Sequence, residues 1–246
     1  SGCTGLTEIA IPSTVTRSNS SAFWECKNLQ AVHITDLDKW LNIIFDGNSA
    51  NPMYYANELL LNGEPITGEV VIPETVTKVP YYALKNTQIT SVILHDNITA
   101  IQDGVFYGCT NLTNIDIPIS VTTIGSYAFY GCTGLTKIDI PTNVTKINDY
   151  TFSGCTGLTE INMPANATTI GSYAFEGCTG LTTLTIPNSV TTISSYAFKG
   201  CTGFTTLTIP NSVTTVSSSA FEDCTGLTTL TIPNSVTTIS SYAFKG

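Results

Sequence analysis

Cysteine returns at a fixed interval of 23 residues along most of this chain, as from Cys109 to Cys132. The interval relates Cys3 to Cys26 and then runs through Cys109, Cys132, Cys155, Cys178, Cys201 and Cys224. Asn86 precedes Cys109 by the same interval, and proline repeats it from Pro118 to Pro233. A constant period of this size is the mark of a repeat array. The sequence therefore predicts a stack of similar units.

One unit, residues 181–203, shows what each repeat forms. Leu184 and Ile186 alternate with threonine, which predicts a short strand with one buried face, and Pro187 ends it because proline cannot extend a ladder. Val190, Ile193, Ala197, Phe198 and Cys201 then return apolar groups to the same interior. The spacing of Ile193, Ala197 and Phe198 fits a single helical turn. Each unit is therefore expected to be one coil.

A lone coil cannot bury its apolar side, so successive coils must stack and their strands must join a parallel sheet. The expected strands are centred on Ile9, Val32, Val70, Val92, Ile115, Ile138, Ile161, Leu184, Leu207 and Leu230. At a strand spacing of about 4.8 Å the sheet would be about 45 Å long. The predicted fold is a curved solenoid with this sheet on one side.

The consensus LxxLxIPxxVxxIxxxAFxxCxx resembles the leucine-rich repeats of BspA-like bacterial surface proteins, in which IP, AF and GC mark each unit. The resemblance covers nearly the whole chain. It implies an α/β solenoid, that is, a leucine-rich-repeat right-handed superhelix with a parallel β-sheet on one face and short helical turns and loops on the other. It also implies an extracellular or cell-surface protein associated with adhesion to host matrix proteins and to other cells.

The period breaks over residues 35–65, within what we expect to be a single solenoid domain spanning 1–246 and cut from a longer chain. Residues 36–41 predict a short helix, 42–45 a strand, and 58–66 a hairpin that turns at Asn62-Gly63. The inserted unit resembles the non-standard unit of the same family and is expected to bulge from the solenoid. An uncapped last coil predicts end-to-end self-contact between copies.

Composition narrows the partners. Only 11% of the residues are charged, and the net charge is −9. An acidic chain of this kind argues against nucleic acid or an anionic membrane as partner. No run of eighteen or more apolar residues occurs, so no membrane insertion is expected within these residues.

The residues offer little for catalysis or metal binding. Stacked cysteines about 5 Å apart come within disulfide reach, but we expect buried free thiols, because the side chains point inward in parallel and a thiol behaves as a small hydrophobe. A straight ladder does not converge on zinc. His33 and His95 occupy different repeat positions, so no triad is expected. We predict no cofactor, no metal and no enzymatic activity.

The outward strand positions are where a solenoid commonly contacts its partner. In the middle of the chain they carry mixed polar residues, and further on they carry only threonine. The candidate partner-binding residues here are Asn114, Asp116, Lys137, Asp139, Glu160 and Asn162. The alternative is a merely soluble strand face, because polar residues are required there in any case.

Aromatic residues outside the interior are a second candidate surface. The candidates are Trp24, Tyr107 and Tyr130 just after the buried phenylalanine, with Trp40, Tyr54 and Tyr55 in the insertion. The alternative is that these rings cover gaps where irregular units pack. Tyrosines at another repeat position are expected to form structural stacks: Tyr127, Tyr150, Tyr173, Tyr196 and Tyr242.

The leading functional hypothesis is a secreted or surface-displayed module that binds a protein or glycan on a host or neighbouring cell. One rival is a passive spacer, since near-identical coils could simply lengthen a stalk. Another is the targeting region of a larger enzyme.

Overall fold

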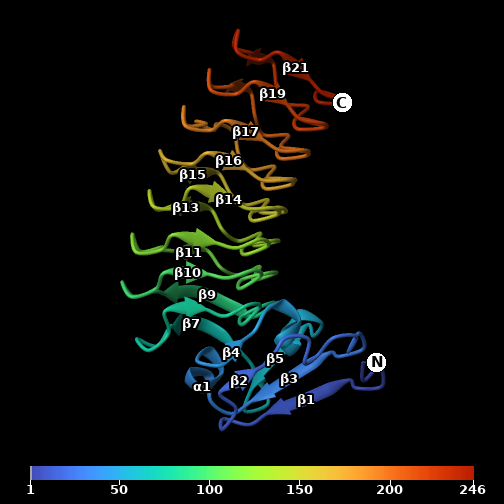
Figure 1. Cartoon of the computed structure of the whole chain (residues 1–246), viewed down its shortest axis with the longest axis vertical. Coiled ribbons are helices and arrows are strands. Elements are labelled where there is room, and N and C mark those ends of the chain that lie inside the picture. The colour runs from blue at the N-terminus through green and yellow to red at the C-terminus, as the bar shows by residue number, and fades with distance from the viewer. Residues whose placement is uncertain (1) are drawn as a thin grey trace.

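The computed structural model of the protein describes residues 2–246. It is a stack of coils along one long axis, with the N-terminal coils at the bottom and the C-terminal coils at the top of Figure 1. Almost every coil gives one strand to a first sheet and one two-residue strand to a second ladder. The buried apolar residues between these two layers form one continuous core. This architecture confirms the predicted leucine-rich-repeat solenoid with a parallel sheet.

The first sheet runs along the stack in short parallel groups. Its strands are β1 (Glu8–Ile11), β3 (Ala31–Ile34), β5 (Glu58–Leu61), β7 (Thr67–Val71), β9 (Gln88–Ile93), β11 (Asn114–Ile115), β13 (Lys137–Asp139), β15 (Glu160–Asn162), β18 (Thr206–Thr208) and β20 (Thr229–Thr231).

The second ladder is parallel too, and over the C-terminal half its strands form one continuous group. Its strands are β2 (Arg17–Ser18), β4 (Ile44–Phe45), β8 (Lys78–Val79), β10 (Ala100–Ile101), β12 (Thr123–Ile124), β14 (Lys146–Ile147), β16 (Thr169–Ile170), β17 (Thr192–Ile193), β19 (Thr215–Val216) and β21 (Thr238–Ile239). A third short pairing is the antiparallel one of β5 with β6 (Glu64–Pro65).

The prediction of a helical turn through Ile193, Ala197 and Phe198 was wrong. Ile193 lies in β17, and the residues after it form consecutive turns. Tyr196 at φ 61° and Gly200 at φ 69° have left-handed backbones. A left-handed residue cannot continue a right-handed helix, so two such residues in each coil replace the helix by turns.

The prediction of a strand around Leu184 was also wrong, since residues 182–186 join no ladder. Residues 205–213 have the same sequence as residues 182–190 and do form β18. The residue before each copy differs: Leu181 precedes the first, whereas the fully buried Phe204 precedes the second and packs edge-on against Phe198. An open cleft of about 560 Å³ lies between the two copies.

Aromatic rings stack from coil to coil on the return side. The buried phenylalanines from Phe106 to Phe244 follow one another at centroid distances of 5.3–5.5 Å. Half-exposed tyrosines from Tyr127 to Tyr196 stack at 4.5–4.6 Å with nearly parallel rings. The expected structural stack of tyrosines is therefore present for these residues. Tyr242 lies beyond it, because Ser219 occupies the coil between.

The irregular segment does not bulge from the solenoid, contrary to our prediction. Helix α1 (Leu37–Leu41) begins after Asp36, whose side chain accepts from the Lys39 amide. Two 3-10 turns follow, η1 (Asn48–Ala50) and η2 (Pro52–Tyr54). Because β4 pairs with β2 and β5 pairs with β3, the segment closes one long coil within both ladders.

The hairpin interrupts the next coil. After β5 the chain reverses at Asn62 and Gly63, both with positive φ, and returns through β6 directly into β7. This coil therefore contributes no strand to the second ladder between β4 and β8.

Proline keeps that ladder open at the same place. In complete coils the residue after the second-ladder strand donates its N–H to the preceding coil, as from Gln102 to Val79 at 3.2 Å and from Asp46 to Ser18 at 3.0 Å. Pro80 occupies this point after β8 and has no N–H to donate. The stack is consequently divided into an N-terminal group of coils and a longer C-terminal group.

The coil that follows the hairpin has 22 residues, because Lys78 pairs with Ala100 across a ladder whose next step is Ala100 with Thr123. The predicted match of Asn86 to the cysteine position is therefore wrong. Thr87 takes that position: its hydroxyl donates to the Leu84 carbonyl at 2.7 Å, as the Cys109 thiol does at 3.0 Å.

Glycine two residues after the cysteine is required by close contact between coils. A Cβ on Gly157 would lie 2.2 Å from the carbonyl oxygen of Thr133, a backbone atom of the preceding coil. We expect Gly157→Ala to lower the free energy of unfolding by about 2 kcal/mol, measured by urea denaturation, because the coils must separate to admit the methyl group. Gly5 occupies the same repeat position with open space around it, so Gly5→Ala is the matched control and should have almost no effect. Equal losses in the two variants would refute this explanation.

Candidate binding surfaces

Six polar residues on the outer side of the first sheet form what we call the acidic patch: Asn114, Asp116, Lys137, Asp139, Glu160 and Asn162. All six side chains are exposed. The register of β13 with β15 places Lys137 beside Glu160 and Asp139 beside Asn162. The structure thus brings four of the six into direct contact and leaves Asn114 and Asp116 one coil away.

Charge in the acidic patch is only partly neutralised. Lys137 Nζ lies 2.9 Å from Glu160 Oε1 and 4.0 Å from Asp139 Oδ1, and the Asn162 amide donates to Asp139. The hydrogen bond to Glu160, with the charge of Asp139, raises the pKa of Lys137. The side chain of Asp116 has no hydrogen bond or ion pair within residues 2–246. Three carboxylates therefore share one ammonium group.

Trp40, a predicted contact residue, is not available to a partner. Its side chain is 1% exposed and packs edge-on against Phe45 at 5.3 Å. Its Nε1 donates to the Ala83 carbonyl at 2.8 Å. Burying an indole N–H requires such an acceptor, so Trp40 joins the two groups of coils as part of the core, as the packing alternative proposed.

The other candidate aromatic residues lie along the turns, away from the acidic patch. Tyr107 and Tyr130 stack at 4.5 Å, and Tyr54 contacts Tyr55 at 4.9 Å. The Tyr55 hydroxyl accepts from the Glu25 amide at 3.1 Å. Trp24 is 54% exposed. The structure therefore does not bring these rings and the acidic patch onto one surface.

A buried lysine, which the sequence analysis did not single out, ties the two groups of coils together. Lys85 Nζ donates to the Ala56 carbonyl at 2.9 Å and lies 5.5 Å from the centre of the Tyr107 ring. Burial lowers its pKa to about 8. A sequence signal existed, since Lys85 stands in a repeat slot that holds Tyr107 in the next coil, but only the contacts with the 3-10 turn explain it.

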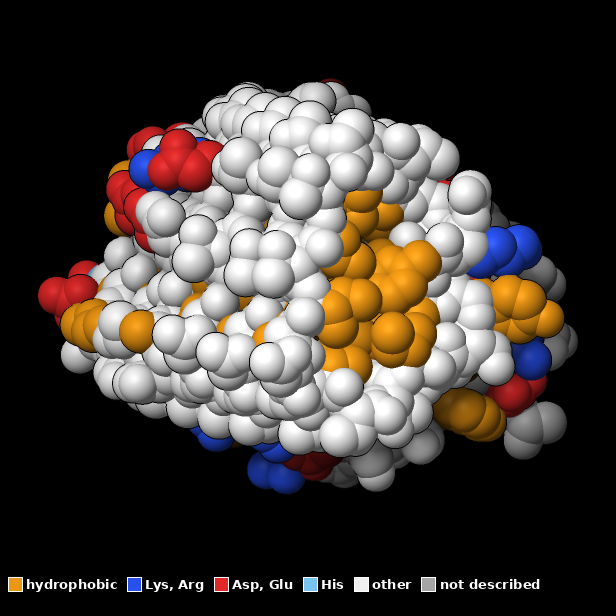
Figure 2. All heavy atoms as spheres, turned by 90° about the horizontal axis from the view of Figure 1, so that it is seen from above, with side chains coloured by type: hydrophobic (Ala, Val, Ile, Leu, Met, Phe, Trp, Pro, Cys, Tyr) orange, Lys and Arg blue, Asp and Glu red, His pale blue; other side chains and the backbone are white. Residues whose placement is uncertain are grey.

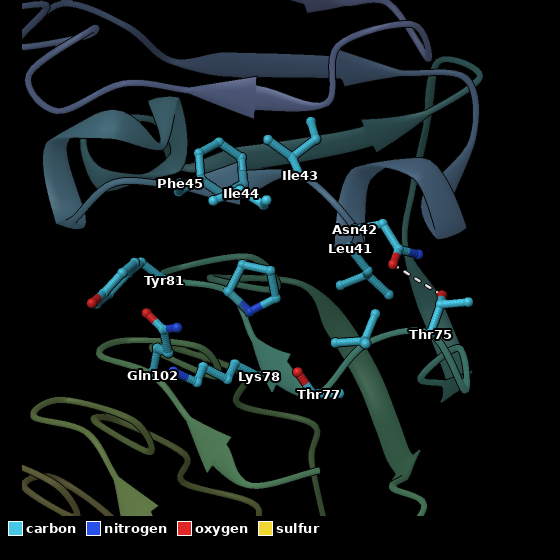
Figure 3. Close-up of a pocket in the computed structure, with 12 residues that line it drawn as sticks. Leu41, Asn42, Ile43, Ile44, Phe45, Thr75, Thr77, Lys78, Tyr81 and Gln102 are labelled. Atoms are coloured by element: carbon cyan, nitrogen blue, oxygen red, sulfur yellow. Dashed lines mark hydrogen bonds between the residues drawn. The ribbon is translucent and has the colours of Figure 1, made fainter. Parts of the chain in front are cut away.

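Between β4 and β8 lies a cleft of about 370 Å³, which we call the junction cleft. In Figure 3 Ile43, Ile44 and Phe45 form its upper wall, and Lys78, Tyr81 and Gln102 lie opposite. The Thr75 hydroxyl donates to Asn42 Oδ1 at 2.9 Å at one side. One wall of the cleft is therefore apolar and the other polar.

The repeat architecture has a matching family. The family model described as the BspA type leucine rich repeat region matches six copies, over residues 1–54, 65–159 and 122–246. The chain belongs to the BspA-type leucine-rich-repeat family. The resemblance seen in the sequence is thereby confirmed. Among curated proteins no sequence matches this chain.

Solved structures of other leucine-rich-repeat proteins are similar to this BspA-type chain. A leucine-rich-repeat protein of T. pallidum is 30% identical, with 63% of this chain and 75% of that chain covered and a TM-score of 0.60. One from Eubacterium ventriosum is 21% identical over 98% and 82%, with a TM-score of 0.53. The pneumococcal vaccine antigen PcpA is 18% identical over 97% and 64%, with a TM-score of 0.56. The last two likenesses show the fold alone.

Membership in the BspA-type family supports a repeat protein that works as a binding module in the general sense. The longest helix in the described part of the chain, α1, has five residues, and none there is long and apolar enough to cross a membrane. No group of three or more His, Cys, Asp or Glu within residues 2–246 could hold a metal ion.

The thiols of this BspA-type chain lie in the interior. Cys132, Cys155, Cys178 and Cys201 are free, and each Sγ donates to the carbonyl of a phenylalanine in the preceding coil at 3.0–3.1 Å. Burial raises the pKa of each of these four thiols. A thiol that resists ionisation is a poor nucleophile and metal ligand, so the ladder is part of the core.

Seen from the C-terminal end, hydrophobic side chains gather in one patch (Figure 2). Phe221, Leu227, Leu230 and Phe244 line a depression of about 350 Å³ there. End-to-end contact between copies stays a prediction.

Proposed function

We propose that this chain is a secreted or surface-displayed adhesion module whose acidic patch binds a basic region of a protein or glycan on another cell or in the matrix. The observation that supports this most directly is the change in the first sheet along the solenoid. Its middle coils carry cross-linked charged and amide side chains, whereas later coils expose only threonine at the same positions.

The geometry favours a basic partner. Three carboxylates and one ammonium on adjacent strands leave an excess of negative charge, and Asp116 retains its full hydrogen-bonding capacity within the described chain. Charged groups at the surface of an interface act mainly on association rate and specificity. The acidic patch is therefore expected to select partners by charge, with affinity that falls as salt is raised.

The test compares two variants with the same change in net charge. Asp116→Asn, Asp139→Asn and Glu160→Gln together neutralise the acidic patch, and we expect them to weaken binding to intact cells or immobilised matrix proteins by about tenfold at low salt. Thr183→Lys, Thr206→Lys and Thr229→Lys raise the net charge equally on the threonine coils and form the control. Both sets lie on exposed strand positions, so both proteins should fold.

Equal weakening in the two variants would mean that net charge alone governs attachment. Unchanged binding after neutralisation would contradict a role for the acidic patch. If the wild-type protein binds no cell or matrix component at all, the spacer interpretation replaces the adhesion module.

A further inference from the structure

The second ladder has a strand missing at one place, and the junction cleft occupies that place. The first sheet contains β5 between β3 and the coil of β7, but the coil of β5 turns back through β6 before it can reach the second ladder. The strands β4 and β8 are consequently edge strands that face the cleft. Edge strands present unpaired backbone groups that can accept an added strand.

The bonding direction of the ladder defines what each edge offers. In complete coils N–H groups point toward the preceding coil and carbonyls toward the following one, as in the bond from Ser194 N to Ile170 O at 2.9 Å. In the coil of β4 the amides of Ile44 and Asp46 already donate backward, to Thr16 and Ser18. The carbonyls of β4 therefore point forward into the junction cleft, where they can accept from an incoming backbone.

Side chains around the cleft are also without partners. Gln102 Oε1 is buried and accepts no hydrogen bond within residues 2–246. Lys78 forms no ion pair with any described residue. Ile44 is 56% exposed beside them. The cleft thus offers an unpaired cation, an unpaired acceptor and an apolar surface on opposite walls.

We propose that the junction cleft binds an extended peptide segment by strand addition between β4 and β8, with an acidic side chain of the peptide beside Lys78. An extended backbone is the one ligand that can satisfy both strand edges at once. This site is separate from the acidic patch, and its preference is opposite, since it selects an acidic segment.

The register of the ladder places the acidic side chain. Arg17 pairs with Ile44, and Lys78 pairs with Ala100 and through it with Thr123, so these residues form one outward column. A strand added in register puts one outward residue between Ile44 and Lys78. Opposite charges on neighbouring strands attract and like charges repel, so glutamate at this point is favoured and lysine is disfavoured.

The experiment uses a fluorescent peptide copied from the ladder itself. Val-Thr-Glu-Ile-Ser reproduces residues 190–194 with glutamate in place of Thr192, the residue of the outward column. We expect saturable binding to the whole chain by fluorescence anisotropy, and about tenfold weaker binding to Lys78→Glu. The peptide Val-Thr-Lys-Ile-Ser should show the reverse preference and bind Lys78→Glu better than the wild type.

Lys146→Glu is the matched control, because Lys146 stands in the same column of a complete ladder. It should leave binding of both peptides unchanged. Absence of saturable binding to the wild type, equal losses in the two lysine variants, or no reversal with the lysine peptide would overturn the proposal. So would an acidic oligosaccharide that binds through Lys78 while the peptide does not. The neutralised acidic patch should bind the peptide as well as the wild type does, so failure of one site is distinguishable from failure of the other.

Discussion

Raising the pH from about 8 to about 10 will lower the free energy of unfolding of this protein by about 6 kcal/mol, because its interior thiols stay protonated in the folded state. Burial raises the pKa of Cys109 and Cys155 to about 12 and that of Cys224 to about 11, from an ordinary value of 9.0. It raises the pKa of Cys132, Cys178 and Cys201 well above that value.

The sign of this effect follows from proton linkage. A raised folded-state pKa means that the stabilisation is complete below the unfolded value of 9.0 and is lost as the pH rises through it toward the folded value. Each of the six thiols loses about 1.4 kcal/mol over this range, or about 8 kcal/mol in all. Lys85 acts in the opposite sense, since its pKa is lowered to about 8, and offsets about 2 kcal/mol.

Urea denaturation at a series of pH values under reducing conditions measures this loss. The variant with Cys155→Ala and Cys178→Ala is the control, because it removes two of the six linked thiols. Its stability at neutral pH will be lower, but its loss between pH 8 and 10 should shrink by about 3 kcal/mol. An unchanged pH dependence in this variant would show that the thiols are not responsible.

Phe175→Ala is the second change expected to have a large effect. Phe175 is fully buried and lies 5.4 Å from Phe152 and 5.3 Å from Phe198. Removing the ring leaves a cavity between coils that the backbone ladders hold in place, so we expect a loss of about 3–5 kcal/mol in the free energy of unfolding. Urea denaturation followed by circular dichroism measures it.

Phe244 provides the matched control, because it is the same residue at the same repeat position. It is 38% exposed and stacks only on Phe221, at 5.5 Å. Phe244→Ala should therefore lower the free energy of unfolding by about 1 kcal/mol. Comparable losses at the two positions would mean that the stack contributes little beyond the burial of single rings.

The period of the sequence was sufficient to predict the coil. Leucine, isoleucine, phenylalanine and cysteine at fixed positions have to meet in one interior, and this requirement does not depend on neighbouring details. The inward direction of the thiols and the stacking of the tyrosines follow from the same repetition. The contact residues of the acidic patch could be chosen for the same reason, since an outward strand position stays outward in every coil.

The conformation of the turns could not be read in this way. Ile193, Ala197 and Phe198 have helical spacing, yet Tyr196 adopts a left-handed backbone that apolar spacing does not reveal. The position of Trp40 is a similar case. Exposure and burial of an aromatic ring in an irregular segment depend on which distant carbonyl it meets, here that of Ala83.

Two properties of this protein therefore have different origins. The sequence by itself determined that the chain forms stacked coils with a buried apolar ladder and a polar sheet face, because a 23-residue period leaves no other way to hide the same residues in every unit. Only the tertiary structure decided where the stacking fails: the identical segments 182–190 and 205–213 differ in pairing, and the turn at Asn62-Gly63 removes a strand beside Pro80. Pairing between coils depends on the neighbour above and below, which local sequence does not contain.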